Sequence, residues 1–212
     1  MNNVQAIRKI PLDELDEEKL KLDSATIDFW HYPNAVPKET CEDIIKFAEG
    51  QWEQAGVGGE NVTTKNVIKE IRDSQVAWTE CSNLYKMVWS YVNNANEKAM
   101  WKFQLDSAQP MQITKYENGG FYNFHKDGNG FTREHVNKSL HTYNKTRKIS
   151  MSIVLNEDYE GGEFEFYEDN RLIKEKTGTV IVFPSYMLHR VRPVTKGVRY
   201  SLVVWFCGEP FV

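Results

Sequence analysis

Apolar residues recur at a helical period in the first half of the chain. They lie three or four positions apart between Cys41 and Ala48, with Pro37 before this run and Gly50 after it. Proline suits the first turn of a helix and glycine suits the position beyond its end. The pattern therefore predicts an amphipathic helix over residues 38–49.

A second apolar stripe predicts a longer helix from Thr79 to Ala99. Its members share one helical face and are Leu84, Met87, Val88, Tyr91 and Ala95. Residues 1–25, by contrast, are polar and predict an N-terminal tail.

After Trp101 the period becomes that of strands, because apolar and polar residues alternate. Short runs of this kind separated by turn residues predict two packed antiparallel sheets. We therefore expect an α+β, mainly β protein with a double-stranded β-helix (jelly-roll) core, and helices that buttress the outer face of one sheet. The predicted strands cover residues 102–105, 111–116, 123–127, 149–155, 162–167, 172–175, 179–183, 189–194 and 199–206.

The length of 212 residues suits one substantial core. We expect a single domain over residues 26–212, preceded by the tail of residues 1–25. Within that domain, residues 26–100 would give helical support and residues 101–212 the jelly-roll core.

Composition narrows the partners and the compartment. The net charge of −4 and the pI near 5.8 give no sign of nucleic-acid binding, which usually leaves a basic footprint. The polar start of the chain and the charged run from Asp13 to Lys19 predict neither a signal peptide nor a membrane-spanning helix. Three scattered cysteines, Cys41, Cys81 and Cys207, predict reduced thiols and a cytoplasmic protein.

The candidate chemistry centres on His125 and Asp127, which are separated by one residue. Side chains alternate faces along a strand, so both would project to the same side. His189 follows another predicted strand and could join them. Two imidazoles and one carboxylate form the facial triad of non-haem iron(II) oxygenases. Arg199, ten positions after His189, offers a guanidinium that can grip a carboxylate with two parallel hydrogen bonds.

An isolated His-x-Asp pair is a weak signal, and most histidines serve local hydrogen bonds. We expect that role, or exposure to water, for His31, His135 and His141. The three blocks around the candidate ligands strengthen the metal interpretation: Tyr116 to His125, Leu155 to Phe164, and Phe183 to Tyr200. Together with the His-x-Asp pair they resemble the prolyl 4-hydroxylase branch of the 2-oxoglutarate/Fe(II) dioxygenases, including the PKHD-type hydroxylases. The resemblance runs from about Met111 to Phe206.

The resemblance implies a role for each matching residue. His125, Asp127 and His189 fall on the iron ligands of the family. Arg199 falls on its basic anchor for 2-oxoglutarate, and Tyr116 is expected beside that co-substrate. Where some relatives place a further co-substrate-binding tyrosine, this chain has none between Ser150 and Leu155.

Three residues are expected in the substrate pocket: Tyr122 and Trp205 match aromatic positions of the family, and Arg192 lies near a ligand. Tyr116, Tyr122 and Trp205 could equally be core or rim aromatics, and Arg192 could face solvent. The polar connection of residues 128–148 begins directly after a ligand, so we expect it to cover the metal as a substrate lid.

The implied activity is hydroxylation of a C–H bond with Fe(II), 2-oxoglutarate and O2, and with ascorbate as a reductant, releasing succinate and CO2. A prolyl residue of a peptide or protein is the first expected substrate. A free amino acid, another small metabolite or a nucleobase is the second, because fold and metal site do not fix the substrate. A non-catalytic jelly-roll binding module is the third interpretation, and the intact triad with Arg199 argues against it.

Overall fold

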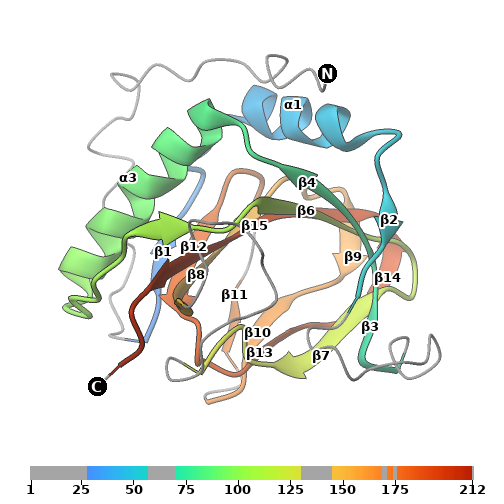
Figure 1. Ribbon diagram of the computed structural model, residues 1–212. Helices are drawn as coiled ribbons and strands as arrows, with labels where there is room; N and C mark the ends of the chain where they lie inside the picture. The colour runs from blue at the N-terminus through green and yellow to red at the C-terminus, as the bar shows by residue number, and fades with distance from the viewer. Residues whose placement is uncertain (1–27, 57–69, 130–144, 169–170, 174–175, 212) are drawn as a thin grey trace.

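The computed structural model describes residues 28–56, 70–129, 145–168, 171–173 and 176–211. In this part of the chain two antiparallel sheets face each other, and two helices lie on the outer side of the larger sheet (Figure 1). The mainly β, double-stranded β-helix architecture predicted from the strand pattern is confirmed. None of the helices in the described residues is long and apolar enough to cross a membrane.

The larger sheet has the strand order β1-β12-β8-β15-β6-β4-β2, and β5 also pairs with β15. The bounds of its strands are β1 (Trp30–Tyr32), β2 (Glu53–Gln54), β4 (Gln75–Thr79), β5 (Ser107–Ala108), β6 (Met111–Tyr116), β8 (Thr146–Val154), β12 (Val180–Pro184) and β15 (Arg199–Gly208). The smaller sheet has the order β11-β10-β13-β7-β3. Its strands are β3 (Arg72–Asp73), β7 (Phe121–His125), β10 (Phe164–Phe166), β11 (Arg171–Ile173) and β13 (His189–Val191). A two-stranded sheet joins β9 (Tyr159–Gly161) to β14 (Val194–Gly197).

The two predicted helices are present as α1 (Lys38–Ala48) and α3 (Ser82–Lys98). The second begins later than expected because Thr79 is the last residue of β4. Both helices turn their apolar stripes to the larger sheet, where Ile44 and Leu84 join Ile113, Met151 and Val204 in one buried cluster.

The opposite face of the larger sheet faces the interior between the two sheets, and its strands β6, β8 and β15 carry several buried polar residues there. Pairing brings Gln112 of β6 beside Val203 of β15, and Val203 beside Ser152 of β8. The next inward residues toward Arg199 are Thr114 and Ser201, which also pair. Burying polar groups costs free energy unless they form hydrogen bonds. Here Gln112 donates to Thr114 at 2.8 Å, and the hydroxyl groups of Ser150 and Ser185 lie 2.9 Å apart.

The bounds of several predicted strands differ in the structure. The strand expected over residues 123–127 ends at His125, so Asp127 lies beyond it. Residues 102–105 are not a strand, because Lys102 adopts a φ of 55° and the Asn96 side chain takes both backbone hydrogen bonds of Phe103. The strand expected over residues 189–194 ends at Val191, since Pro193 has no N–H to donate. Val194 then opens β14, in another sheet.

The region expected to be helical support also supplies β1, β2, β3 and β4. Strands β3 and β4 are separated only by Ser74, yet β3 pairs with β7 in the smaller sheet and β4 with β6 in the larger one. This crossing links the β3 edge of the smaller sheet to the larger sheet and closes one side of the barrel (Figure 1).

Candidate metal centre

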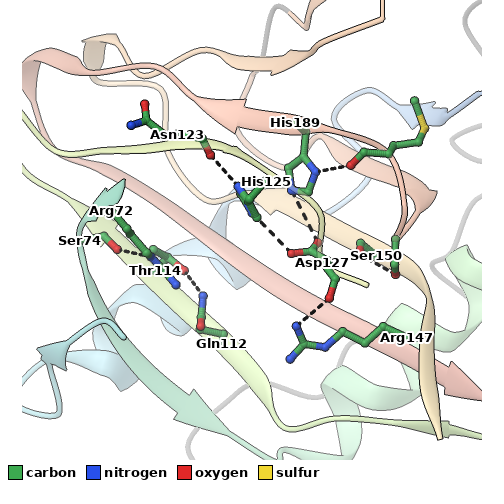
Figure 2. A network of polar contacts seen from close by, with 12 residues as sticks. Arg72, Ser74, Gln112, Thr114, Asn123, His125, Asp127, Arg147, Ser150 and His189 are labelled. Carbon is green, nitrogen blue, oxygen red and sulfur yellow. Dashed lines mark hydrogen bonds and ion pairs between the residues drawn. The ribbon is translucent and has the colours of Figure 1, made fainter. Parts of the chain in front are cut away.

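His125, Asp127 and His189 converge between the two sheets (Figure 2). His125 ends β7 and His189 begins β13, and the two residues are direct partners in the antiparallel pairing of these strands. The Nε2 atoms of His125 and His189 lie 3.5 Å and 3.6 Å from the two carboxylate oxygens of Asp127. One ligand atom from each residue lies within 4.8 Å of the other two.

Asp127 lies beyond the end of β7, and its backbone is fixed by the turn after β12. The backbone N–H groups of Asp127 and Gly128 both donate to the carbonyl of Ser185, each at 3.0 Å. Ser185 is in turn bonded to β8, through its N–H to Lys148 O at 2.9 Å and through its hydroxyl to that of Ser150 at 2.9 Å. The strand that precedes His189 therefore also positions Asp127.

Each histidine is oriented by a backbone carbonyl two residues earlier. Nδ1 of His125 lies 2.8 Å from Asn123 O, and Nδ1 of His189 lies 2.9 Å from Met187 O. A carbonyl oxygen only accepts, so Nδ1 carries the proton in both rings and Nε2 offers its lone pair toward Asp127. Second partners of this kind are typical of metal-ligating histidines.

The electrostatics keep the three groups ready to bind a cation. His189 is packed among Phe164, Phe166 and Phe183. Burial lowers the pKa of His189 to about 4, against the opposing effect of Asp127, so the imidazole is neutral near pH 7. Burial opposes ionisation of Asp127 too, but the facing His189 and His125 outweigh it and hold the pKa of this carboxyl below its ordinary value.

This donor set fits a divalent transition metal. Two neutral imidazole nitrogens and one carboxylate oxygen on one side of a site leave the other positions open, the arrangement used by non-haem Fe(II) oxygenases. With Nδ1 of each histidine donating to its backbone carbonyl, the two Nε2 atoms and the Asp127 carboxylate can supply the lone pairs that such an ion needs.

Arg199 and Tyr116 lie together deeper in the barrel. They are direct partners in the pairing of β15 with β6, and the guanidinium carbon lies 5.7 Å from the centre of the Tyr116 ring. Arg199 is the largest side chain among those less than 2% exposed. Gly162 makes room for it: a Cβ there would lie 3.0 Å from Arg199 Cδ.

The two predicted pocket aromatics occupy different places. The Tyr122 ring stacks on His125 with centroids 3.5 Å apart, and burial raises the pKa of Tyr122 to about 12. Trp205 lies on the inner face of β15, 6.4 Å from the ring of Trp78. Its indole Nε1 is buried without a hydrogen-bond partner in the described part of the chain.

Arg192 is not brought to this centre. It follows the end of β13, and its Nε donates to Glu165 at 2.6 Å. Arg190 donates to the same carboxylate oxygen at 2.8 Å. Glu165 is 1% exposed, so the two arginines compensate a buried charge on the outer face of the smaller sheet.

Sequence reasoning missed residues that support the centre without being ligands, above all Ser185, Arg147 and Gly162. Their contacts join positions far apart in the chain, so spacing alone gave no signal, apart from the glycine pair at 161–162. The predicted lid of residues 128–148 is shorter at its C-terminal end, because Thr146 to Lys148 belong to β8. Residues 130–144 of that lid lie outside the described residues, so its role stays a prediction.

Comparison with known proteins shows which proteins this chain resembles. The family model described as the 2OG-Fe(II) oxygenase superfamily matches residues 111–207. The PKHD-type hydroxylase of Aliarcobacter butzleri (strain RM4018) is 29% identical over 188 residues, covering 82% of this chain and 76% of that protein.

Two solved structures share the fold. A prolyl-4-hydroxylase of Pseudomonas putida aligns with a TM-score of 0.61 and 21% identity, over 92% of this chain and 98% of the other. A Trichoplax adhaerens prolyl hydroxylase, solved in complex with a peptide fragment of the hypoxia inducible factor oxygen degradation domain, aligns with a TM-score of 0.65 and 18% identity, over 92% and 88%.

Proposed function

We propose that the chain is a member of the 2OG-Fe(II) oxygenase superfamily, whose model matches residues 111–207, and that it hydroxylates a prolyl residue in a peptide or protein. It is a 2-oxoglutarate- and Fe(II)-dependent hydroxylase of the prolyl hydroxylase type. The observation that carries this conclusion is the convergence of His125, Asp127 and His189, with both histidine Nε2 atoms directed at the carboxylate.

In this proposal His125 Nε2, His189 Nε2 and a carboxylate oxygen of Asp127 hold the iron. Arg199 binds the distal carboxylate of 2-oxoglutarate, with Tyr116 beside it. The burial of Arg199 supports this role, because a buried guanidinium is stabilised by a carboxylate that accepts two parallel hydrogen bonds. The polar inner face of β6, β8 and β15 lies along the same interior and would solvate the co-substrate.

Bound Fe(II), with 2-oxoglutarate and O2, supplies the oxidising power that hydroxylates an unactivated C–H bond while succinate and CO2 are released. The residues of the chain do the rest. Asn123 O and Met187 O keep the proton of each histidine on Nδ1. Phe164 and Phe183 exclude water from one side of His189. The ordering of these groups before the reaction lowers its reorganisation cost.

The prolyl substrate is supported by the relatives. The two solved neighbours are named as prolyl hydroxylases, and the Trichoplax protein holds a peptide. Trp205 and Tyr122 would line the substrate side of the site, as their aromatic surfaces suit the apolar ring of proline. The cytoplasm is the proposed compartment, because Cys41, Cys81 and Cys207 form no disulfide within the described residues.

The test is a succinate-release assay on a panel of proline-containing peptides, free amino acids and small organic acids, with mass spectrometry to locate the added oxygen. Succinate release coupled to hydroxylation of a prolyl peptide is expected, and Asp127→Ala is expected to abolish it. Coupled hydroxylation of only a free amino acid or another small molecule would replace the prolyl proposal with the second substrate class. Turnover by Asp127→Ala equal to that of the wild-type protein would contradict the proposed metal site.

A further inference from the structure

Strand β8 carries a bulge beside the candidate metal centre. Phe206 of β15 pairs with Ile149, but the next residue, Cys207, pairs with Arg147, so Lys148 is the extra residue. A bulge changes which side of a strand the following side chains occupy. Here Arg147 turns into the barrel, over the Trp205 ring, while the Lys148 ammonium lies over Phe211.

The bulge gives Arg147 three partners around one guanidinium. Its Nε and Nη2 both donate to Gln109 Oε1, at 2.9 Å and 2.6 Å, and its guanidinium carbon lies 3.9 Å from the centre of the Trp205 ring. The remaining nitrogen, Nη1, donates to the backbone carbonyl of Asp127 at 3.2 Å (Figure 2). Gln109 is only 1% exposed and is itself fixed by its N–H to Trp205 O.

These contacts fix the backbone of Asp127 on both sides of its Cα. Its N–H is held by Ser185 O, and its carbonyl is held by Arg147. The space is also closed on this side, since a Cβ at Gly128 would lie 3.0 Å from Arg147 Cβ. Asp127 is the only one of the three candidate ligands that follows the end of its strand, so sheet pairing alone does not orient it.

We propose that Arg147 is a positioning residue that holds Asp127 in its metal-binding orientation by clamping the Asp127 carbonyl against the Gln109 and Trp205 anchor. This inference rests on the proposed function, because it takes Asp127 as a metal ligand. The clamp needs the rigid fork of a guanidinium, which reaches Gln109 and Asp127 at once, and an ammonium is only a point charge.

The experiment titrates Co(II) into metal-free protein and follows both the affinity and the visible absorption of the bound ion. The variants are Arg147→Gln, Arg147→Lys and Gln109→Leu, with Asp127→Ala as the loss-of-ligand reference. Lys145→Gln is the matched control, because it removes a positive charge from the same chain segment where Lys145 pairs with Asp106. Thermal unfolding of each metal-free protein establishes that the variants are folded.

Arg147→Gln and Arg147→Lys are both expected to weaken Co(II) binding by about 10- to 100-fold, the usual loss when a group that supports a ligand is removed, and to change the absorption of the bound ion. Lys145→Gln is expected to match the wild-type protein. Gln109→Leu, which leaves Asp127 untouched, should weaken binding less, and the Gln109→Leu, Arg147→Gln double variant should be no weaker than Arg147→Gln.

Wild-type affinity in Arg147→Gln, or full recovery in Arg147→Lys, would overturn the clamp. Strictly additive losses in the double variant would overturn it too, since the two residues would then act separately. If Arg147→Gln does not fold, Gln109→Leu decides in its place: an unchanged affinity rejects the anchor. Wild-type binding by Asp127→Ala would instead remove the metal site, and with it the proposed function.

Discussion

The phenol ring of Tyr122 lies face to face with the imidazole of His125, with centroids 3.5 Å apart and planes inclined by 15°. Arg72 also lies over the Tyr122 ring, with its guanidinium carbon 4.6 Å from the ring centre. Arg72 is 6% exposed, and its Nε donates to Ser74 at 2.7 Å. The crossing between the two sheets thus supports the His125 ring through one aromatic side chain.

Replacing Tyr122 tests this support. Tyr122→Leu is expected to weaken metal binding by about fivefold, because a stacked aromatic pair contributes roughly 1 kcal/mol beyond the area that it buries. Tyr122→Phe keeps the ring and should bind metal like the wild-type protein. The measurement is a Co(II) titration of each metal-free variant. An equal loss in Tyr122→Phe would assign the effect to the hydroxyl group instead of the stack.

Removing the carboxylate tests the metal centre itself. Asp127→Ala is expected to lose stoichiometric Fe(II) binding, one ion per chain, and 2-oxoglutarate turnover, because two imidazoles alone leave the charge of the ion without its anionic ligand. Anaerobic Fe(II) titration and succinate release measure the two effects. Stoichiometric binding that persists in a His125→Ala, His189→Ala double variant would contradict the proposed centre.

The metal-free protein should become less stable in acid because of His189. Its folded pKa of about 4 lies below the ordinary 6.5. Between these values the unfolded chain binds a proton that the folded protein does not, so the free energy of unfolding falls as the pH drops from about 6.5 to about 4. At 1.36 kcal/mol per unit the loss approaches about 3 kcal/mol. Urea unfolding of the wild-type protein and of His189→Gln measures the free energy of unfolding across this pH range. The difference between the two proteins should narrow toward acid, whereas parallel dependences on pH would contradict the lowered pKa of His189.

The sequence predicted the parts of this site that depend on local spacing. His125 ends one strand and His189 begins another, so periodicity was enough to place the two histidines. Residues 111–116 form a strand with the predicted bounds for the same reason. Asp127 lies beyond the strand that was expected to hold it, and its backbone is positioned by the Ser185 carbonyl instead. The mainly β architecture follows from the number of such short runs.

The rest depends on contacts that spacing does not encode. The bulge at Arg147 and Lys148 exists only relative to β15, and alternation read from Ser150 and Ser152 would have turned Lys148 inward. The carbonyl of Ser185 accepts two N–H groups from Asp127 and Gly128, a contact across more than fifty residues. The assignment of Arg192 to the substrate pocket stays a prediction. In the structure its side chain forms an ion pair with Glu165.

Gly162 tests whether the space around Arg199 is limiting. Its φ is 66°, and a Cβ would meet Arg199 Cδ and Val194 Cγ2, each at 3.0 Å. Gly162→Ala is expected to cost about 1–2 kcal/mol of stability through the left-handed backbone and to raise the KM for 2-oxoglutarate. Gly119→Ala is the control, because its φ is 87° but no atom lies within 4 Å of the position that a Cβ would take there. It should lose stability without a change in KM, and a similar KM in both variants would contradict the crowding of Arg199.

Arg199 itself should set the affinity for the co-substrate. Arg199→Ala is expected to lower kcat/KM for 2-oxoglutarate. The loss should correspond to about 2–5 kcal/mol of binding free energy, the usual loss when one partner of a buried charge pair is removed. Arg199→Lys should raise KM by less, because an ammonium keeps the charge but not the fork. Fe(II) affinity should stay near normal in both, since Arg199 lies beside Tyr116 and not among the three ligands. Arg190→Lys, on the outer face against Glu165, is the matched control and should leave KM unchanged. A near-normal KM in Arg199→Ala would mean that another cation binds the distal carboxylate, and the fully buried Arg199 would then serve the fold alone.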